Sequence, residues 1–195
     1  MRWVIPLGRI AGIPIGVNWT WLPIVALVIA NYASDVFPSQ NPGLSGTTYL
    51  VMAAALALLF FAGLLLHELG HALVAKRQGM EIEGITLWLL GGVARILGEF
   101  PGPGAEFRVA VAGPAVSFAI GATFAAVAWL VPLPNAVDGV VVWMAISNLF
   151  LLAFNLIPAY PLDGGRILHA VLWRFQDDRG SATRVSVGIG RGFGL

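Results

Sequence analysis

Four long apolar stretches constrain the fold of this chain more than any other feature of its sequence. A membrane-spanning helix needs roughly 20 mostly apolar residues, and such stretches lie near residues 17–33, 47–75, 107–130 and 138–156. Only 11% of the 195 residues are charged, whereas a soluble domain carries about 25%, so lipid must be the solvent for much of the surface. We therefore predict a mainly α-helical, polytopic membrane protein with about four transmembrane helices, in a single domain over residues 1–195.

The distribution of basic residues predicts how these helices are oriented in the membrane. Cytoplasmic loops are enriched in Lys and Arg, and neither the loop at 31–49 nor the loop at 131–142 contains one. All 11 basic residues lie before the first span, around the junction of the second and third spans, or after the fourth. We therefore place the N-terminus and these segments in the cytoplasm, so that the second and fourth spans both end at the cytoplasmic leaflet. The N-terminus lacks the features of a cleavable signal peptide, so we expect the first span to be retained.

Two segments do not fit a spanning helix. Residues 81–97 are rich in strand-forming residues and are interrupted by Gly91 and Gly92, which predicts a membrane-associated β-hairpin or short sheet. Such backbone survives at membrane depth only if protein or a water-filled cavity covers its polar groups. The tail from Gly180 is too short to span a membrane. We expect a C-terminal helical segment there, truncated before a last helix is complete.

The predicted second span ends with the sequence HELGH at residues 67–71, which indicates a metal site. The chain contains no cysteine, so a metal must be held by His, Asp or Glu. His67 and His71 stand four residues apart and project from one face of a helix, a spacing that lets two imidazoles bind one zinc ion. Glu68 is positioned to act as the general base on a zinc-activated water. Because ionisable residues within a span are costly and functional by default, a chance occurrence of this pattern is the less favoured interpretation.

The predicted fourth span ends with the sequence NLIPAYPLDGGR at residues 155–166. Pro158 and Pro161 break the helix, and the glycines after Asp163 permit tight turns, so we expect this segment to unwind and present the Asp163 carboxylate. Because both spans end on the same side, Asp163 can reach the two histidines, and a His₂-carboxylate set leaves the fourth zinc position open, as a catalytic site requires. The amide of Asn155 could donate to an oxyanion or make an interhelical hydrogen bond, and the residues alone leave both open.

Together these two strings resemble the motifs of the site-2 protease family of intramembrane metalloproteases. HELGH matches the zinc motif of that family, and residues 155–166 match its second motif, Asn-x-x-Pro-x-x-Pro-Leu-Asp-Gly. GGVAR at 91–95 and AGP at 112–114 are also similar to family sequences. The likeness covers nearly the whole chain and is closest to the bacterial and archaeal subgroup that often carries C-terminal CBS domains.

The resemblance implies roles for the residues in these motifs. His67, His71 and Asp163 would hold one Zn²⁺ ion per chain, and Glu68 would be the general base. Asn155 would help to hold the substrate or the oxyanion, so the resemblance favours the functional interpretation of this residue.

The resemblance also implies a substrate and a location. The segment at 81–97 would correspond to the family's membrane-associated strands, with Gly91, Gly92 and Val93 contacting a substrate helix that unwinds and adds as a strand. The protein would be a zinc metalloendopeptidase of regulated intramembrane proteolysis, cutting in or near the transmembrane helices of membrane-tethered, regulatory proteins. It would lie in a prokaryotic cell membrane, with the lipid bilayer around it and its active site toward the cytoplasm.

Three alternatives to a site-2 protease share part of these features. A membrane metalloprotease of the CAAX-processing type would share residues 67–71 but would not explain residues 155–166. A zinc transporter also needs His and Asp in the membrane, but transporter sites lie on repeat-related broken helices; no repeat stands out here, and Glu68 would have no role. A binding-only pseudoprotease is disfavoured because every residue that the chemistry needs is present. A formal net charge of +1 without a basic patch indicates no nucleic-acid partner.

Several polar residues are expected to lie outside the site. His169 is the remaining histidine, and the His₂-carboxylate set is complete without it. Four acidic residues are expected to be solvated or to cap helices, with a gating role for one of them as the alternative: Glu81, Glu83, Glu99 and Glu106.

Overall fold

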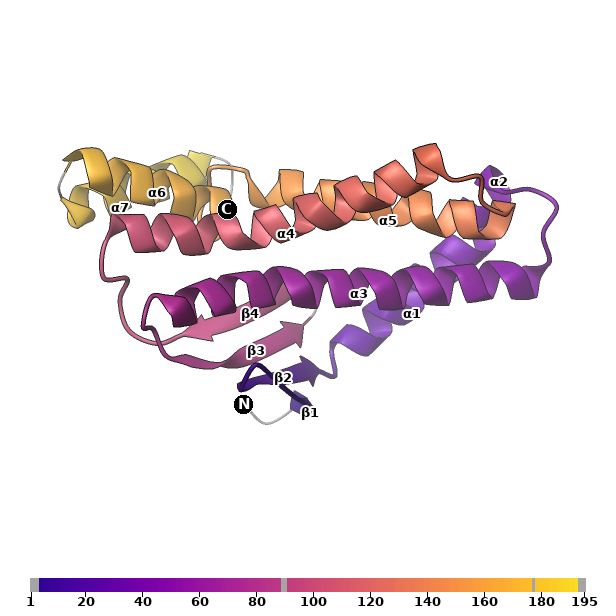
Figure 1. Ribbon diagram of the computed structural model, residues 1–195, viewed down its shortest axis with the longest axis horizontal. Helices are drawn as coiled ribbons and strands as arrows, with labels where there is room; N and C mark the ends of the chain where they lie inside the picture. Colours follow the sequence, from indigo (N-terminus) through magenta and orange to yellow (C-terminus); the bar gives the residue numbers. More distant parts are fainter. Residues whose placement is uncertain (1–3, 89–90, 177, 193–195) are drawn as a thin grey trace.

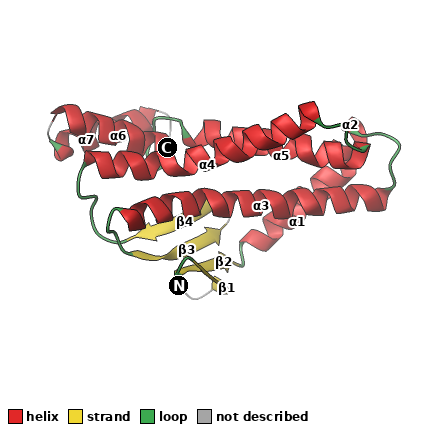
Figure 2. Ribbon diagram, in the orientation of Figure 1, coloured by secondary structure: helices red, strands yellow, loops and turns green. Residues whose placement is uncertain are grey.

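The computed structural model describes residues 4–88, 91–176 and 178–192, and it is mainly helical, with a small sheet on one side (Figure 2). In chain order the elements are β1 (Val4–Ile10), β2 (Ile13–Asn18), α1 (Trp21–Asn31), η1 (Tyr32–Val36), α2 (Phe37–Gln40), α3 (Gly46–Arg77), β3 (Ile82–Trp88), β4 (Gly91–Ile96), α4 (Pro103–Leu130), α5 (Asn135–Asn155), α6 (Asp163–Gln176) and α7 (Arg179–Gly192). The predicted combination of spans, membrane-associated strands and a C-terminal helical segment is confirmed.

Four helices in the described part of the chain are long and apolar enough to cross a membrane. They are the continuous run Trp21–Gln40, which contains α1, η1 and α2, and the single helices α3, α4 and α5. The last three begin and end within a few residues of their predicted bounds. In Figure 1, the long helix α3 lies between the α4–α5 pair and the sheet, so α3 is the central element of the fold.

The predicted bounds of the first span were wrong at both ends. Val17 lies in strand β2, and the helix begins at Trp21 and continues to Gln40. Ile13, Ile15 and Val17 alternate along β2 and are buried against the core, a period of two that a count of apolar residues does not distinguish from a helix. Ala11 and Gly12, with φ of 51° and 80°, form the two-residue turn that joins β1 to β2.

The sheet lies along α3, on the side away from α4 and α5 (Figure 2). Its strand order is β1-β2-β3-β4, with a parallel pairing between β2 and β3 and antiparallel pairings outside. Ile85 and Leu87 of β3 are fully buried and pack with Leu64, Leu69 and Ala72 of α3. The predicted hairpin within residues 81–97 is therefore present as β3 and β4, and β4 is an edge strand beside the part of α3 that carries residues 67–71.

Small residues let α3 approach its neighbouring helices closely. A Cβ atom on Gly70 would lie 3.0 Å from the carbonyl oxygen of Ala112 in α4, and a Cβ on Gly63 would lie 3.0 Å from Asn148 Oδ1 in α5. Close backbone approach at small residues is how membrane helices pack. The interior face of α3 is thereby brought against α4 along the turns that hold the predicted zinc motif.

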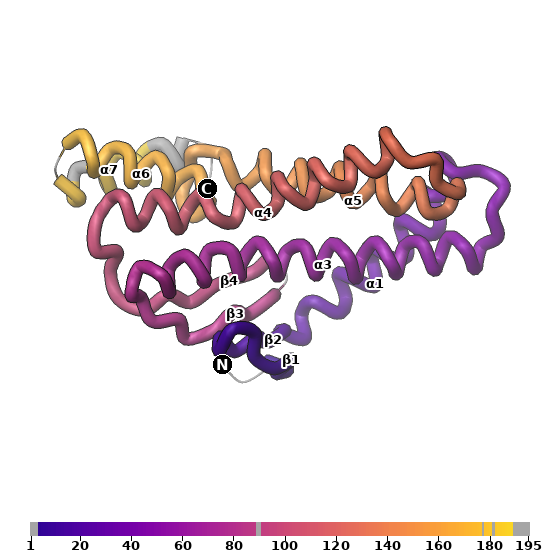
Figure 3. The backbone as a smooth tube through the Cα atoms, viewed as in Figure 1, coloured from indigo at the N-terminus to yellow at the C-terminus, as the bar shows by residue number. Residues whose placement is uncertain are grey.

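The chain unwinds after α5 ends at Asn155 and becomes helical again at Asp163, which is the first residue of α6. Gly164 and Gly165 pack directly on this unwound segment, since a Cβ on Gly165 would lie 2.5 Å from the Ala159 carbonyl carbon. Helices α6 and α7 lie at the end of the bundle where α3 and α5 finish (Figure 3). This arrangement brings Asp163 to the C-terminal half of α3, as the predicted topology required.

Candidate metal and active site

Three side chains converge where α3, α4 and α6 meet. His67 and His71 lie one turn apart on α3, and Asp163 begins α6. The Nε2 atoms of the two histidines are 3.2 Å apart, and each lies 3.2 Å from Asp163 Oδ2. The structure thus brings together the three predicted ligands, as a group that could hold a metal ion.

The other ring nitrogen of each histidine is engaged by α4. His71 Nδ1 lies 2.7 Å from the Val109 carbonyl oxygen, and His67 Nδ1 lies 2.9 Å from Ser117 Oγ. A carbonyl oxygen can only accept a hydrogen bond, so His71 Nδ1 donates and the Nε2 atom of the neutral ring keeps its lone pair. Partners of this kind fix the orientation of metal-binding imidazoles.

The spacing of the three ligand atoms fits a tetrahedral zinc ion. Bonds of about 2.0–2.1 Å to such an ion separate its ligand atoms by about 3.3–3.4 Å, close to the observed 3.2 Å. Asp163 Oδ2 is buried, and no described residue donates a hydrogen bond of good geometry to it. Burial raises the pKa of Asp163, but the two histidines outweigh burial and hold that pKa at about 2. The carboxylate is therefore ionised at neutral pH, the form that binds a metal.

Gly113 of α4 makes room for this group. A Cβ built at Gly113 would lie 2.1 Å from His71 Nε2 and 2.6 Å from His67 Nε2. Any side chain at this position would occupy the space beside the ligand atoms where a metal binds. The close passage of α4 therefore requires glycine here.

Glu68, the predicted general base, lies between α3 and the edge strand β4. Its Oε2 atom accepts a hydrogen bond from the Ala94 backbone N–H at 3.2 Å. A Cβ on Gly92 would lie 2.3 Å from Glu68 Cγ. The absence of a side chain at Gly92 therefore leaves the space that the Glu68 side chain occupies. The carboxylate is close enough to all three predicted ligands for each of them to interact with it electrostatically.

The other predicted site residues lie around this centre. Gly91 and Val93 flank Gly92 on β4, and Val93 is exposed. Asn155 is the last residue of α5, and its amide donates to the Leu151 carbonyl oxygen one turn earlier at 3.0 Å. The amide is thus engaged within its own helix, and the role of Asn155 toward a substrate or an oxyanion stays a prediction.

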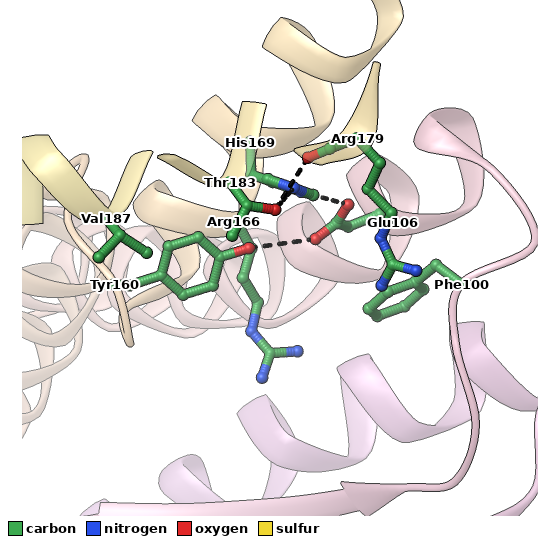
Figure 4. A pocket seen from close by; sticks show the side chains of 8 residues that line it. All are labelled: Phe100, Glu106, Tyr160, Arg166, His169, Arg179, Thr183 and Val187. Atoms are coloured by element: carbon green, nitrogen blue, oxygen red, sulfur yellow. Dashed lines mark hydrogen bonds and ion pairs between the residues drawn. The ribbon is translucent and has the colours of Figure 1, made fainter. Parts of the chain in front are cut away.

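The expectation that Glu106 is solvated was wrong, because α6 docks over it. Glu106 is 4% exposed and His169 is 3% exposed. His169 Nδ1 lies 2.7 Å from Glu106 Oε2, and the Tyr160 hydroxyl donates to Glu106 Oε1 at 3.4 Å (Figure 4). Burial, and after it the Glu106 carboxylate, raises the pKa of Tyr160 to about 12, so the hydroxyl remains a donor. His169 does not belong to the group of His67, His71 and Asp163 that could hold a metal ion.

Sequence reasoning missed the part that α4 plays in the site. Val109, Gly113 and Ser117 follow one another at four-residue intervals on one helix face. Gly113 lies in the AGP string that contributed to the family resemblance, and Ser117 is a buried hydroxyl within an apolar span. Small and polar residues repeated every four positions in a span signal a helix contact, but they do not reveal which helix is contacted.

Fold and site together define a class: a polytopic membrane protein with a buried His-His-Asp group beside an edge strand. The sequence profile of peptidase family M50 matches residues 55–137 and 132–194. The chain belongs to peptidase family M50.

Individual relatives agree with this assignment. Rip3 of Mycobacterium tuberculosis is 44% identical over 194 residues, which cover 98% of this chain and 48% of Rip3. Zinc metalloprotease MJ0392 of Methanocaldococcus jannaschii is 36% identical over 195 residues, which cover 100% of this chain and 53% of the relative. The solved structure of the site-2 protease from Methanocaldococcus jannaschii aligns with a TM-score of 0.64 at 33% identity, over 98% of this chain and 81% of that chain.

These comparisons confirm the resemblance to site-2 proteases that the motifs indicated. The family and the four apolar helices identify an integral membrane protein. The chain spans about half the length of the curated relatives it matches.

Proposed function

We propose that this chain is an intramembrane zinc endopeptidase that hydrolyses peptide bonds in or near the transmembrane helices of membrane-tethered, regulatory proteins. Membership of peptidase family M50 supports the reaction class, and a relative that is named a zinc metalloprotease supports the metal. One observation carries the proposal: three ligand atoms lie 3.2 Å from one another, and beside them the buried carboxylate of Glu68 accepts a hydrogen bond from the edge strand β4.

His67, His71 and Asp163 would hold one zinc ion per chain. When bound, zinc supplies Lewis acidity, which polarises a peptide carbonyl and makes a water molecule more acidic. The contacts of α4 with both Nδ1 atoms keep the imidazoles turned toward the ion. Asp163 contributes a negative charge, and three protein ligands leave a position open for catalysis.

Glu68 would accept the proton of the attacking water and return it to the leaving amine. Its Oε2 atom is held by the Ala94 N–H, so Oε1 is the atom available to take the proton. Asn155 would contribute its amide to the developing oxyanion. To do so it must exchange the Leu151 carbonyl, its partner at 3.0 Å, for the substrate.

The substrate would bind as an added strand along the open edge of β4. In a strand, the backbone groups of residues two apart face the same edge. The backbone groups of Gly92 therefore face the same edge of β4 as the Ala94 N–H, which donates to Glu68. Peptide bonds inside a helix are shielded, so the substrate must unwind before attack, and an unwound segment can pair with an exposed strand. An apolar cavity of about 260 Å³, lined in part by Trp21, Phe61 and Gly91, adjoins this hairpin and can accept a substrate side chain.

We infer that the site lies toward the cytoplasm. The loops at 41–45 and 131–134, which carry no Lys or Arg, connect helices at the end of the bundle away from α6 and α7 (Figure 1). The positive-inside rule assigns such loops to the outer face. The N-terminus and the metal centre would then lie toward the cytoplasmic face of a prokaryotic cell membrane.

Glu68→Gln separates the proposed chemistry from metal binding. We expect the purified variant in detergent to retain its zinc and to lose cleavage of a model transmembrane substrate, because the amide cannot accept the proton. Glu83→Gln is the matched control, since Glu83 lies on β3, half exposed, and pairs with Arg95 at 3.3 Å. Cleavage by Glu68→Gln at the wild-type rate would contradict the role of Glu68. Equal zinc flux across vesicles in both proteins would instead support transport.

A further inference from the structure

A buried pair of side chains lies beyond the metal centre, and the proposed chemistry does not use it. Glu106 stands in the first turns of α4 and His169 in the middle of α6, joined by the 2.7 Å contact between Oε2 and Nδ1. His169 Nε2 lies 3.0 Å from Thr183 Oγ1 of α7, and Glu106 Oε1 accepts from Tyr160 (Figure 4). Both ring nitrogens and both carboxylate oxygens thus have partners, which holds the ring in one orientation.

The pair belongs to the same face of α4 that organises the metal centre. Glu106, Val109, Gly113 and Ser117 are spaced three or four residues apart, which places them in one stripe along the helix, and all four are buried. Glu106 bonds to His169 of α6, and the Val109 carbonyl oxygen accepts from His71. Gly113 leaves space beside both histidine ligands, and Ser117 bonds to His67. One stripe of α4 therefore sets the position of α3 and of α6, the two helices that carry the three ligands.

Asp163 depends on the docking of α6 in a way that the histidines do not. His67 and His71 share one helix, so their separation is set by its geometry. Asp163 is carried on a separate helix and follows the unwound segment 156–162, so the path of the chain alone does not hold its carboxylate 3.2 Å from both rings.

The chemistry of the pair is suited to setting position rather than to adding stability. Burying a polar or charged pair carries a desolvation cost, and well-packed apolar residues of similar volume are often as stable or more so. A hydrogen bond, however, has a required direction and length, which apolar contact lacks. An apolar pair would let α6 slide or rotate on α4, and the Asp163 carboxylate would move with it.

We propose that Glu106 and His169 are positioning residues for the metal ligand Asp163. Their hydrogen bond holds α6 in the one register on α4 that completes the ligand triangle. His169 lies six residues after Asp163, about 9 Å along the helix axis, so it acts through α6 and not by touching the metal. Thr183 supports the ring from α7. The inference rests on the proposed function, because it concerns the affinity of the same site for zinc.

Metal affinity and protein stability, measured separately, test this proposal. We expect Glu106→Leu to weaken zinc binding roughly 10–100-fold, measured by competition with a chelator on the whole chain in detergent. The visible spectrum of the cobalt-loaded variant should change, because the ligand geometry changes. The melting temperature of the metal-free Glu106→Leu variant should fall, because His169 is left buried without its partner, whereas that of the double variant Glu106→Leu/His169→Leu should stay the same or rise. Glu106→Gln keeps an acceptor for His169 Nδ1 and should restore most of the affinity.

Two further variants keep the test decisive. His169→Leu should match Glu106→Leu, and the double variant should be no worse than either, because both changes remove one interaction. Thr183→Val removes only the support from α7 and should weaken zinc binding less than Glu106→Leu. Ser186→Ala is the control, since Ser186 is a buried hydroxyl on the same helix that makes no hydrogen bond with the described residues, and its zinc affinity should equal that of the wild type.

Unchanged zinc affinity and an unchanged cobalt spectrum in Glu106→Leu and Thr183→Val would overturn the proposal, even if the melting temperature fell, because the pair would then serve stability alone. If the folded wild-type chain itself bound neither metal, the proposed function would fail first, and the pair would have no ligand to position.

Discussion

Two buried polar clusters lie along the same face of α4, and they differ in how their donors and acceptors are matched. In the metal cluster (His67, His71 and Asp163), two ring nitrogens and a carboxylate oxygen face one another at 3.2 Å. His71 donates its Nδ1 proton to the Val109 carbonyl oxygen, and in the described part of the chain Asp163 Oδ2 has no hydrogen-bond donor of good geometry. In the joint (Glu106 and His169), each of the four polar side-chain atoms has a partner.

The difference shows what each cluster is for. Buried lone pairs that face one another without a proton between them are unfavourable, and an added cation, either a proton on a histidine or a metal ion, resolves the conflict. A cluster whose donors and acceptors are matched is complete as it stands and can hold helices in register. Both clusters are buried and both contain histidine and a carboxylate, so their composition does not separate them, whereas the hydrogen-bond partners of their polar atoms do.

His71→Ala should have the largest effect on the metal cluster. It removes one of the three ligands. Zinc affinity should therefore fall by more than the roughly 10–100-fold that follows the loss of a residue hydrogen-bonded to a ligand. Zinc per chain after gel filtration measures this. Stoichiometric zinc in the variant would show that the cluster is not the metal site.

Gly113→Ala should come next, because its Cβ would lie 2.1 Å from His71 Nε2 and either α4 or the ring must move. We expect strongly weakened zinc binding and loss of cleavage, measured by chelator competition and by a substrate assay. Gly46→Ala is the control, because a Cβ on Gly46 meets nothing within 4 Å in α3 and alanine favours a helix by up to about 1 kcal/mol over glycine. Equal zinc affinity in both variants would mean that α4 does not approach the metal cluster so closely.

Ser117→Ala should have an intermediate effect. It removes the partner of His67 Nδ1 at 2.9 Å and leaves the ligand itself in place, so zinc affinity should fall by roughly 10-fold, the low end for such partners. Isothermal titration with zinc measures the change. Thr123→Ala is a matched control on the same helix, because Thr123 is exposed and bonds only its own helix, at Ala119. An equal loss in both variants would point to a general weakening of α4.

Tyr160→Phe should have the smallest effect, and it tests the joint. The hydrogen bond to Glu106 is long, at 3.4 Å, so its loss should cost about 0.5–1.5 kcal/mol of unfolding free energy at most, with zinc affinity unchanged. The folded-state pKa of Tyr160 is raised from 10.0 to about 12, so the hydroxyl's contribution is present below pH 10 and is lost as the pH rises toward 12. The stability difference between wild type and variant should therefore shrink over that range. A pH-independent difference would show that the hydroxyl is not titrating there.

Local patterns in the sequence determined much of this protein. Apolar runs long enough to span a membrane predicted four helices, three of them with nearly correct bounds. The spacing of His67 and His71 determined that both rings share a helix face, and Pro158 and Pro161 determined where α5 ends. Each of these inferences depends on residues within a few positions of one another, where backbone geometry alone decides the outcome. The single domain over residues 1–195 stays a prediction.

Tertiary structure decided the rest. The partners of the site histidines lie 50 and 38 residues away in the sequence, and His169 lies 63 residues from Glu106. Ile13, Ile15 and Val17 became a strand because β3 pairs beside them and α3 covers them. A hydrogen bond between helices depends on the register at which they pack, and that register is set by the sum of many side-chain contacts. A local sequence pattern does not determine this register. The contacts that orient the ligands can therefore be identified only from the packing of the helices.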